Sequence, residues 1–226
     1  MARRKARLTR NEIIQVATQM FLEKGYSNTS IKAISDKLDI STGNLTFYFP
    51  TKEHLLAQLV EMLCAFQWKL MERVIGEGES SLMAVCLELT SMASVCEENE
   101  IIKDFYLAAY KHELSLELIR QSDMRRAKMV FGEYCTDWVD EHFAVAENIT
   151  SGIEYATLMT TDSSIPLDTR IAGALNMIMQ TYAVPEAVRK QKIKKVLSMN
   201  YQKIGRDILD DFMEYIKDVN EKALEN

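Results

Sequence analysis

Proline and glycine are scarce in this sequence, which contains only three prolines and eight glycines in 226 residues. A protein with many β-strands needs frequent turns, and these two residues are the strongest turn signals, so their scarcity favours helices. No apolar run approaches the roughly 18 residues that a membrane-spanning helix needs. The basic start, MARRKARLTR, is not followed by the apolar stretch of a signal peptide. We therefore expect a helical protein of the cytoplasm with no membrane partner.

Cysteine and histidine are also few, and their spacing excludes several kinds of site. The four cysteines lie 22, 10 and 39 residues apart, which matches neither a disulfide framework nor a paired metal motif, so we expect buried thiols in a reducing compartment. His112-Glu113 is not followed by the second histidine of a zinc protease, and no nucleophile elbow, phosphate loop or dinucleotide fingerprint occurs. We therefore expect no metal, no cofactor and no enzymatic activity.

Basic residues gather near the N-terminus of an otherwise acidic chain. Residues 1–53 hold nine Lys and Arg against five acids, a net charge of +4, whereas the rest of the chain carries −10. This asymmetry suggests that only the first part meets a polyanion such as DNA. The four basic residues before the first helix are either an arm that follows DNA or a frayed tail; they are Arg3, Arg4, Lys5 and Arg7.

Apolar residues recur at helical spacing along the whole chain. Thr9 with Glu12 forms a capping box ahead of the first helix, Gly25 is placed to end it, and Thr29 or Ser30 can cap a second helix. We find no alternating strand and no internal repeat, so the sequence predicts an all-α fold. The longer helices are expected at 51–75, 81–97, 100–119, 123–143, 147–161, 167–182 and 204–219.

The stretch ISTGNLTFYFP, residues 40–50, makes a poor helix by itself. Weak helix formers surround Gly43, which costs about 1 kcal/mol against alanine, and Pro50 leaves the run too short to be stable alone in water. Leu45 and Phe49 can pin it to its neighbours. Three short helices with a tight turn between the last two form a helix-turn-helix module, and the last of them enters the DNA major groove.

The segment GYSNTSIKAISDKLDISTGNLTFYFPTKEHL, residues 25–55, resembles the DNA-binding signature of the TetR family of bacterial transcriptional regulators. Two positions depart from the family pattern. Ser35 replaces an alanine, and Thr46 stands where the family usually has a tyrosine that contacts a DNA phosphate. The positions that match are Gly25, Tyr26, Thr29, Ile34, Ile40, Ser41, Gly43, Leu45, Tyr48, Phe49, Lys52, Leu55 and Leu56.

The resemblance and the side-chain chemistry together divide the expected DNA contacts into two groups. Thr29, Tyr48 and Lys52 are expected at phosphates, with Ser41 assisting and with Thr46 as a shorter donor than the usual tyrosine. The base edges are assigned to three side chains that can pair with adenine or meet a thymine methyl, with Gly43 allowing close approach of the backbone. These three are Thr42, Asn44 and Phe47, although Phe47 and Tyr48 could instead simply pack.

The resemblance implies a DNA-binding domain at residues 1–53 and a helical ligand-binding and dimerisation domain at 54–226. A homodimer is expected on a near-palindromic operator, with a small-molecule inducer that shifts the spacing of the two heads through the helix at 51–75. No embedded charge singles out a ligand class. The expected pocket lining is Phe66, Met92, Phe105, Tyr106, Tyr110, Met129, Phe131, Tyr134 and Trp138. The expected dimer face is Ile171, Leu175, Ile178, Tyr182, Ile208, Phe212 and Ile216, unless these stripes are core of the protomer.

These features favour a transcriptional regulator, most simply a repressor. The alternative is a helical regulatory protein that binds a protein partner and has lost direct contact with DNA, for which the missing tyrosine at position 46 is the best argument. A titration with salt separates the two, because phosphate contacts make affinity fall steeply as salt rises.

Overall fold

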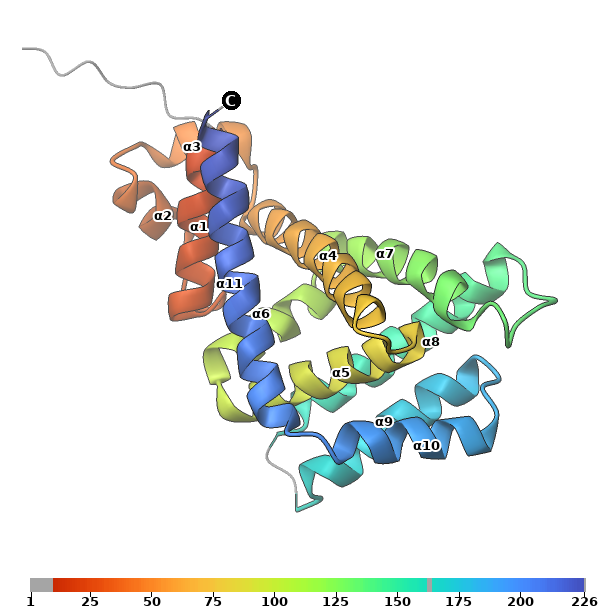
Figure 1. Ribbon diagram of the computed structural model, residues 1–226. Coiled ribbons are helices and arrows are strands. Elements are labelled where there is room, and N and C mark those ends of the chain that lie inside the picture. Colours follow the sequence, from red (N-terminus) through yellow and green to blue (C-terminus); the bar gives the residue numbers. More distant parts are fainter. Residues whose placement is uncertain (1–9, 162–163, 226) are drawn as a thin grey trace, which may run out of the picture.

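The computed structural model describes residues 10–161 and 164–225, and over these residues every regular element is an α-helix (Figure 1). The capping box predicted at Thr9 and the basic arm before it lie outside the described residues. The all-α prediction is confirmed. In chain order the helices are α1 (Arg10–Lys24), α2 (Ile31–Lys37), α3 (Thr42–Tyr48), α4 (Lys52–Gly76), α5 (Ser81–Glu98), α6 (Glu100–Lys111), α7 (Glu113–Phe131), α8 (Asp140–Met159), α9 (Leu167–Thr181), α10 (Glu186–Leu197) and α11 (Tyr201–Glu225).

Helices α1, α2 and α3 form a small head at one end of the molecule (Figure 1). Gly25 ends α1 with a φ of +89°, a conformation that glycine adopts without strain. Ser30 caps α2 by accepting a hydrogen bond from the Ala33 amide, and Ser41 caps α3 in the same way from Asn44. Asp39, with a φ of 53°, makes the tight turn between them. The head therefore has the predicted helix-turn-helix order.

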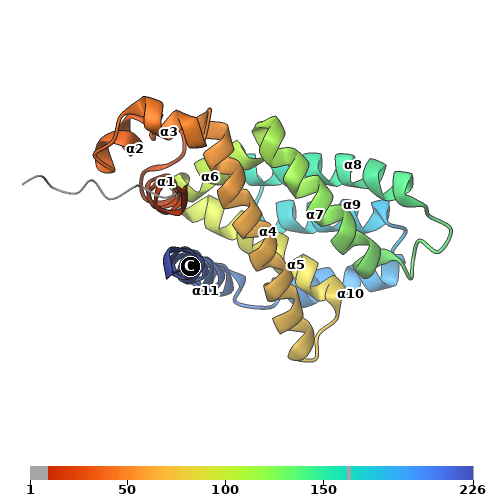
Figure 2. The ribbon, with the colours of Figure 1, turned by 90° about the horizontal axis from the view of Figure 1, so that it is seen from above.

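Helix α4 leaves the head directly after Pro50 and runs into a larger helical body. Helix α5 lies at the centre of that body and packs against α4, α6, α8, α9, α10 and α11 (Figure 2). Its sequence is apolar on nearly every side, which is what a helix surrounded by others requires. The predicted boundary between residues 53 and 54 falls within the first turn of α4.

Two of the predicted helix boundaries in the body are wrong. The range 100–119 is not one helix, because α6 ends at Lys111 and α7 begins at Glu113. His112 adopts an extended conformation there, and its ring lies 5.2 Å from that of Tyr26 in the head. The range 123–143 is broken as well, since α7 ends at Phe131 and α8 starts at Asp140. Helix α10 follows Pro185 and was not predicted at all.

Helix α11 packs inside the protomer, against α5, α4 and α1, and so runs from the body back beside the head (Figures 1 and 2). Gly205 permits this close approach, since a Cβ there would lie 3.1 Å from the Ser91 carbonyl oxygen. Arg206 pairs with Glu98 on α5, and Arg73 on α4 pairs with Asp211.

This packing overturns the predicted dimer face. Helical spacing identifies an apolar stripe but not the partner that covers it, and here other helices of the same chain cover both stripes. Ile208 is half-buried, and the other six residues are buried: Ile171, Leu175, Ile178, Tyr182, Phe212 and Ile216.

All four cysteines are free and buried, as predicted from their spacing. Burial raises the pKa of Cys64, Cys86 and Cys96 to about 12, so these thiols stay protonated and inert. In the described part of the chain, no helix combines the length and the apolar character needed to cross a membrane.

Candidate functional site

The outer face of α3 presents small and polar side chains to solvent. Thr42, Gly43 and Asn44 are exposed, and Phe47 is 82% exposed. Leu45 is fully buried and is the residue that fixes α3 to the rest of the head. A Cβ added at Gly43 would meet nothing closer than the Ser41 hydroxyl at 3.9 Å. Nothing inside the protomer therefore requires glycine at this position, and the exposed face is free to meet a partner.

Thr29 does not lie where a phosphate contact was predicted. Its side chain is buried, and its hydroxyl donates to the carbonyl oxygens of Gly25, at 2.8 Å, and Met20, at 3.3 Å. These carbonyls belong to the last turns of α1 and to the residue that follows it. Thr29 thus stabilises the turn between α1 and α2, and its side chain is not available to DNA.

The other side chains predicted to contact phosphates lie at the surface, but each already has a partner within the protomer. Ser41 uses its hydroxyl to cap α3, and the Thr46 hydroxyl donates to the Gly43 carbonyl at 3.3 Å. Lys52 donates to the Tyr26 carbonyl at 3.0 Å and lies over the Tyr26 ring. Tyr48 is half-buried, with its ring against that of Phe47. A phosphate would have to share these groups with their present partners.

The head is fastened to the body through the turn after α1. Asp104 on α6 accepts hydrogen bonds from the backbone N–H and the hydroxyl of Ser27. A Cβ at Gly25 would come within 2.9 Å of the same carboxylate, so this turn needs glycine for space as well as for its φ. Beside it, the ring of His112 lies against Tyr26. The orientation of the head is therefore set by α6 and by the α6–α7 junction.

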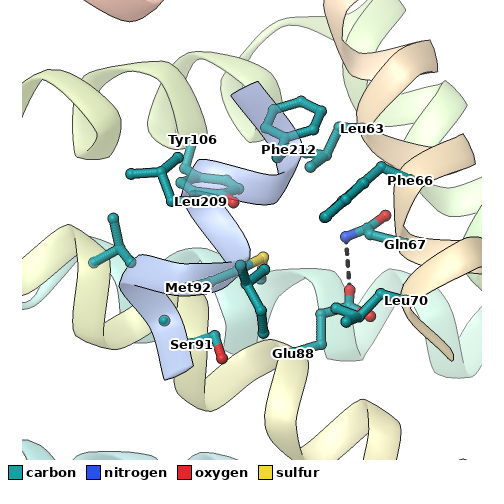
Figure 3. Close-up of a pocket in the computed structure, with 13 residues that line it drawn as sticks. Leu63, Phe66, Gln67, Leu70, Glu88, Ser91, Met92, Tyr106, Leu209 and Phe212 are labelled. Carbon is teal, nitrogen blue, oxygen red and sulfur yellow. Dashed lines mark hydrogen bonds between the residues drawn. The ribbon is translucent and has the colours of Figure 1, made fainter. Parts of the chain in front are cut away.

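A first cavity, of about 30 Å³, lies between α4, α5, α6 and α11 (Figure 3). Phe66, Met92 and Tyr106 line it, as predicted. Figure 3 shows Phe66 and Phe212 on one side and Met92 on the other, with the Gln67 amide directed at Glu88. Such a volume holds about one water molecule, so this lining is closely packed in the present conformation.

The other predicted pocket residues are dispersed. Phe131 lines a second cavity, whereas Phe105 is part of the buried core. Met129 is 52% exposed and points away from both cavities, so its assignment is wrong. Tyr134 and Trp138 lie in the connection between α7 and α8, because the helix expected there is broken. Tyr110 is buried and holds a carboxylate beside the second cavity.

The second cavity, also about 30 Å³, lies where α5, α7, α8 and α9 meet and is lined by charged groups. Arg126 on α7 is only 6% exposed. Its Nη2 pairs with Glu88 on α5 at 2.7 Å, and its Nε lies 3.5 Å from Asp123. Glu88 also accepts from Gln67 on α4 at 2.6 Å. A chain of polar contacts thus connects α4, which leads to the head, with α7.

Two further glutamates face this cavity from α8, and each is held by a tyrosine. Tyr182 donates to Glu147, and Tyr110 donates to Glu154 at 2.8 Å. Burial raises the pKa of Glu147 to about 7, with the nearby Asp123 adding to the effect. Burial likewise raises the pKa of Asp123 to about 6, against the opposing effect of Arg126, and raises that of Glu154 well above its ordinary value. The cavity therefore has an excess of carboxyl groups.

The sequence of α7 contains a pattern that indicates this cluster of charged residues. Asp123 and Arg126 lie on the same stripe of α7 as buried Ile119, Ala127 and Val130. Ionisable residues on an apolar face are uncommon and usually paired, so they point to a buried polar site. The partner residues come from other helices, and only the fold brings them together.

The head of the molecule is similar to a known family of proteins. Residues 13–59, from α1 to the start of α4, match the family model described as bacterial regulatory proteins, tetR family. Residues 13–59 therefore carry the DNA-binding signature of the TetR family. It is 33% identical over 94 residues to YuxN of Bacillus subtilis (strain 168), an uncharacterized HTH-type transcriptional regulator, in a match covering 40% of this chain but only 31% of YuxN. It is 27% identical over 157 residues to the HTH-type transcriptional regulator QacR of Staphylococcus aureus (strain Mu50), covering 64% of this chain and 83% of QacR.

Solved structures extend the likeness to the body. RolR, crystallised without ligand, superposes with a TM-score of 0.60 at 20% identity, covering 80% of this chain and 95% of RolR. FadR of Thermus thermophilus, described as a TetR family transcriptional repressor in complex with lauroyl-CoA, gives a TM-score of 0.59 at 17% identity, covering 78% of this chain and 97% of FadR. These likenesses show that the chain, its helical body included, shares the fold of these two structures.

Glu147 should make the stability of the folded protein depend on pH. The folded protein holds the Glu147 proton up to about pH 7, whereas the unfolded chain holds it only to about 4.5. The contribution of Glu147 to the free energy of unfolding is therefore fully present below pH 4.5, and it is lost as the pH rises towards 7. Glu147→Gln keeps an acceptor for Tyr182 without a charge, so it should exceed the wild type by up to about 3 kcal/mol near pH 8 and match it near pH 5.

Urea unfolding at a series of pH values measures this difference. Glu141→Gln is the matched control, since Glu141 is exposed on the same helix, and it should leave the curve unchanged. Asp123 and Glu154 also face Glu147 and titrate in both proteins, while Arg126 stays charged, so only the difference between the two curves reports on Glu147. A constant difference at all pH values would show that Glu147 is ionised throughout.

Proposed function

We propose that this chain is a transcriptional regulator, most simply a repressor, that binds a near-palindromic DNA operator as a homodimer and is modulated by a small molecule held in its helical body. Residues 1–53 would form the DNA-binding domain, and 54–226 the ligand-binding and dimerisation domain. Such a protein works in the cytoplasm. The observation that carries the proposal is the exposed face of α3, with Thr42, Asn44 and Phe47 free of partners that would compete with bases.

The chemistry of that face supports DNA in preference to a protein partner. Apart from Phe47, the outward side chains of α3 are small and polar, and Gly43 allows a partner to approach the backbone. Lys52, at the start of α4, supplies a positive charge beside the base-reading residues. The charge of residues 1–53 is positive although the whole chain is acidic. A polyanion is therefore the partner that this surface fits.

Selection of bound sequences from random duplex DNA, followed by a salt titration, tests the proposal. The logarithm of affinity should fall by about 0.9 for each neutralised phosphate against the logarithm of salt concentration, and the selected sites should be two-fold symmetric. If no sequence is enriched and binding does not depend on salt, the alternative of a protein partner is favoured.

Asn44 is the side chain best suited to sequence reading, because its amide can pair bidentately with adenine. Asn44→Ala should weaken binding by about 1–3 kcal/mol and relax the base preference at one position of each half-site. Lys52→Gln serves as the comparison, since loss of a phosphate contact should weaken all sequences equally and reduce the salt slope by about one. Repeating the selection with both variants checks this. An unchanged sequence profile for Asn44→Ala would assign the reading to another residue.

We propose the outer face of α8 as the dimer face, in place of the buried stripes. Val145 and Ile149 are more than half exposed on it, and Met159 is 47% exposed. With Gly152 and Ala156, these residues recur at alternating spacings of four and three, the pattern by which two helices interlock. Helix α9 packs beside α8 and adds Met177, which is 51% exposed. The two helices from each protomer would together form a four-helix contact.

A charge in the middle of this seam should separate the protomers. Ile149→Glu would place a carboxylate between two apolar faces, and we expect a shift from dimer to monomer at micromolar concentration together with weaker operator binding. Light scattering coupled to size exclusion measures the mass. Ala187→Glu, on the exposed face of α10, is the control and should remain dimeric. A dimer that survives Ile149→Glu would place the interface elsewhere.

The ligand would act through contacts already present between body and head. Gln67 on α4 is hydrogen-bonded to the Glu88–Arg126 pair, and Asp104 on α6 holds the turn after α1. A ligand that favours a different arrangement of α4 and α6 would change the orientation of the two reading helices. The coupling is reciprocal, so operator DNA must weaken ligand binding by the same factor.

A further inference from the structure

The second cavity contains more buried acid than buried base. Carboxyl groups of Asp123, Glu147 and Glu154 line it together with the guanidinium of Arg126, and Glu88 pairs with that guanidinium from outside the lining. Arg126 forms its ion pairs with Glu88 and Asp123 only. Among the described residues, neither Glu147 nor Glu154 forms an ion pair, and each accepts a hydrogen bond from a tyrosine hydroxyl. The guanidinium of Arg120 is hydrogen-bonded to Ser151. Two carboxyl groups are thus left without an ion pair.

Unsatisfied polar atoms in the same cavity are a separate observation. Arg126 is more than nine-tenths buried, and its Nη1 has no hydrogen-bond partner. The Oδ1 of Asp123 is also buried and unpartnered; its 3.5 Å separation from the Arg126 Nε is an ion pair without a hydrogen bond. A buried donor or acceptor left unsatisfied costs about 1–3 kcal/mol. A bound molecule that supplied both partners would remove this cost.

Apolar and aromatic groups complete the lining of the cavity. Val85, Ala127 and Ile178 come from three different helices. Phe131 and Tyr182 stack at 4.1 Å with their planes 4° apart, and both line the cavity. A ligand would therefore meet both carboxyl groups and a flat aromatic surface.

We propose that this cavity binds an organic cation that carries N–H donors, of the amine or amidinium class, with its charged group facing Asp123, Glu147 and Glu154 and its apolar part against Phe131 and Ile178. This inference rests on the proposed function, because it names the class of the modulating ligand. N–H groups match the carboxylate acceptors, and an acceptor elsewhere on the ligand would satisfy the Arg126 Nη1. Because the cavity now holds about one water molecule, a larger ligand must move α7 and α8 apart.

Other ligand classes fit this site less well. An anion would pair with Arg126 but would meet the three carboxyl groups of the lining. A neutral molecule would leave the charge imbalance as it is. A metal ion would need several oxygen ligands converging on one point, and among the described residues no group of three or more acidic, cysteine or histidine side chains is arranged to hold one. The raised pKa of Glu147, caused first by burial, agrees with a carboxyl group that takes up a proton when no cation is bound.

Four matched probes with the same ring test the proposal: benzamidine, benzamide, benzoate and benzyltrimethylammonium. Isothermal titration calorimetry with the full chain near pH 8, where the carboxyl groups ionise most readily, should show binding of benzamidine. Benzamide and benzoate should bind at least tenfold more weakly. Benzyltrimethylammonium, which is cationic but has no N–H group, should be weaker than benzamidine. Binding of benzoate in preference to benzamidine, or equal binding of all four probes, would overturn the proposal.

Substitutions locate the probe and separate this proposal from that of the regulator. Glu147→Gln and Glu154→Gln should each reduce benzamidine affinity at least tenfold, whereas Glu141→Gln should not; using two variants protects against one that fails to fold. Calorimetry requires no DNA, so its outcome is independent of operator binding. If benzamidine binds both variants as tightly as it binds the wild type, then it does not bind in this cavity and the proposal is wrong. If benzamidine binds here but the chain binds no DNA, the cation site stands and the proposed regulatory function fails.

Discussion

Replacing Arg126 with methionine should destabilise the protein by about 3–5 kcal/mol near neutral pH, because the substitution leaves the carboxylates of Glu88 and Asp123 buried without their cation. Urea unfolding measures the change. The loss should shrink towards pH 5, since a carboxyl group that has lost its cation can take up a proton instead. Arg126→Met is therefore expected to unfold with a steeper dependence on pH than the wild type does.

Arg125→Met is the matched control, because Arg125 is the neighbouring residue on α7 but is exposed, with its Nε on the Gln121 carbonyl. It should change stability by no more than about 0.5 kcal/mol. Adding Glu88→Gln and Asp123→Asn to Arg126→Met should restore much of the loss, because neutral amides in place of charges remove the uncompensated groups. If Arg126→Met is as stable as Arg125→Met at every pH, then the carboxyl groups are already protonated and the ion pairs contribute nothing.

Replacing Leu45 with alanine should have the largest effect on the head. Leu45 is fully buried, and it is the only buried residue among the seven of α3. Loss of a buried leucine costs about 2–5 kcal/mol, and α3 is far too short to persist without packing. We expect hydrogen exchange to speed up in residues 41–49 and operator binding to be largely lost, with the body still folded.

Phe47→Ala is the comparison for this prediction, since Phe47 lies two residues away and is 82% exposed. It should leave stability within about 0.5 kcal/mol of the wild type and still weaken operator binding. The pair separates a residue that holds the reading helix from one that meets DNA. If Phe47→Ala lowered stability as much as Leu45→Ala does, the exposed ring would have a packing role that its surroundings do not indicate.

The joint between head and body connects these two regions. Asp104 on α6 holds Ser27, and the ring of His112 lies against Tyr26. Helix α4 continues from the head to Gln67, one end of the polar chain through Glu88 to Arg126. A rearrangement at the charged cavity therefore has a continuous set of packed contacts through which to reach α3, which is the physical requirement for coupling between two sites.

Local chemistry in the sequence determined the head. Gly25 ends a helix because few other residues adopt its φ, Ser41 caps α3 with its own hydroxyl, and Pro50 closes a helix that cannot continue through it. These effects act between residues a few positions apart, so they can be read without the fold. The same is true of the face of α3, where a period of 3.6 places Leu45 inside and Asn44 outside. Thr29 is the exception, since the carbonyl of Met20 that it satisfies lies nine residues away.

The body was decided by tertiary structure. An apolar stripe indicates that one face of a helix is buried, but it does not indicate which element buries it. The stripes of α9 and α11 are buried by other helices of the same chain. The break at His112 has no local signal and follows from packing on Tyr26. The charged cavity has carboxyl groups from α7 and α8, and its arginine pairs with Glu88 of α5, which lies 66 positions before Glu154 in the sequence. Each of these is an ordinary residue on its own helix. Only their juxtaposition away from bulk water raises the pKa values of Asp123, Glu147 and Glu154 and gives the cavity its proposed preference for a cation.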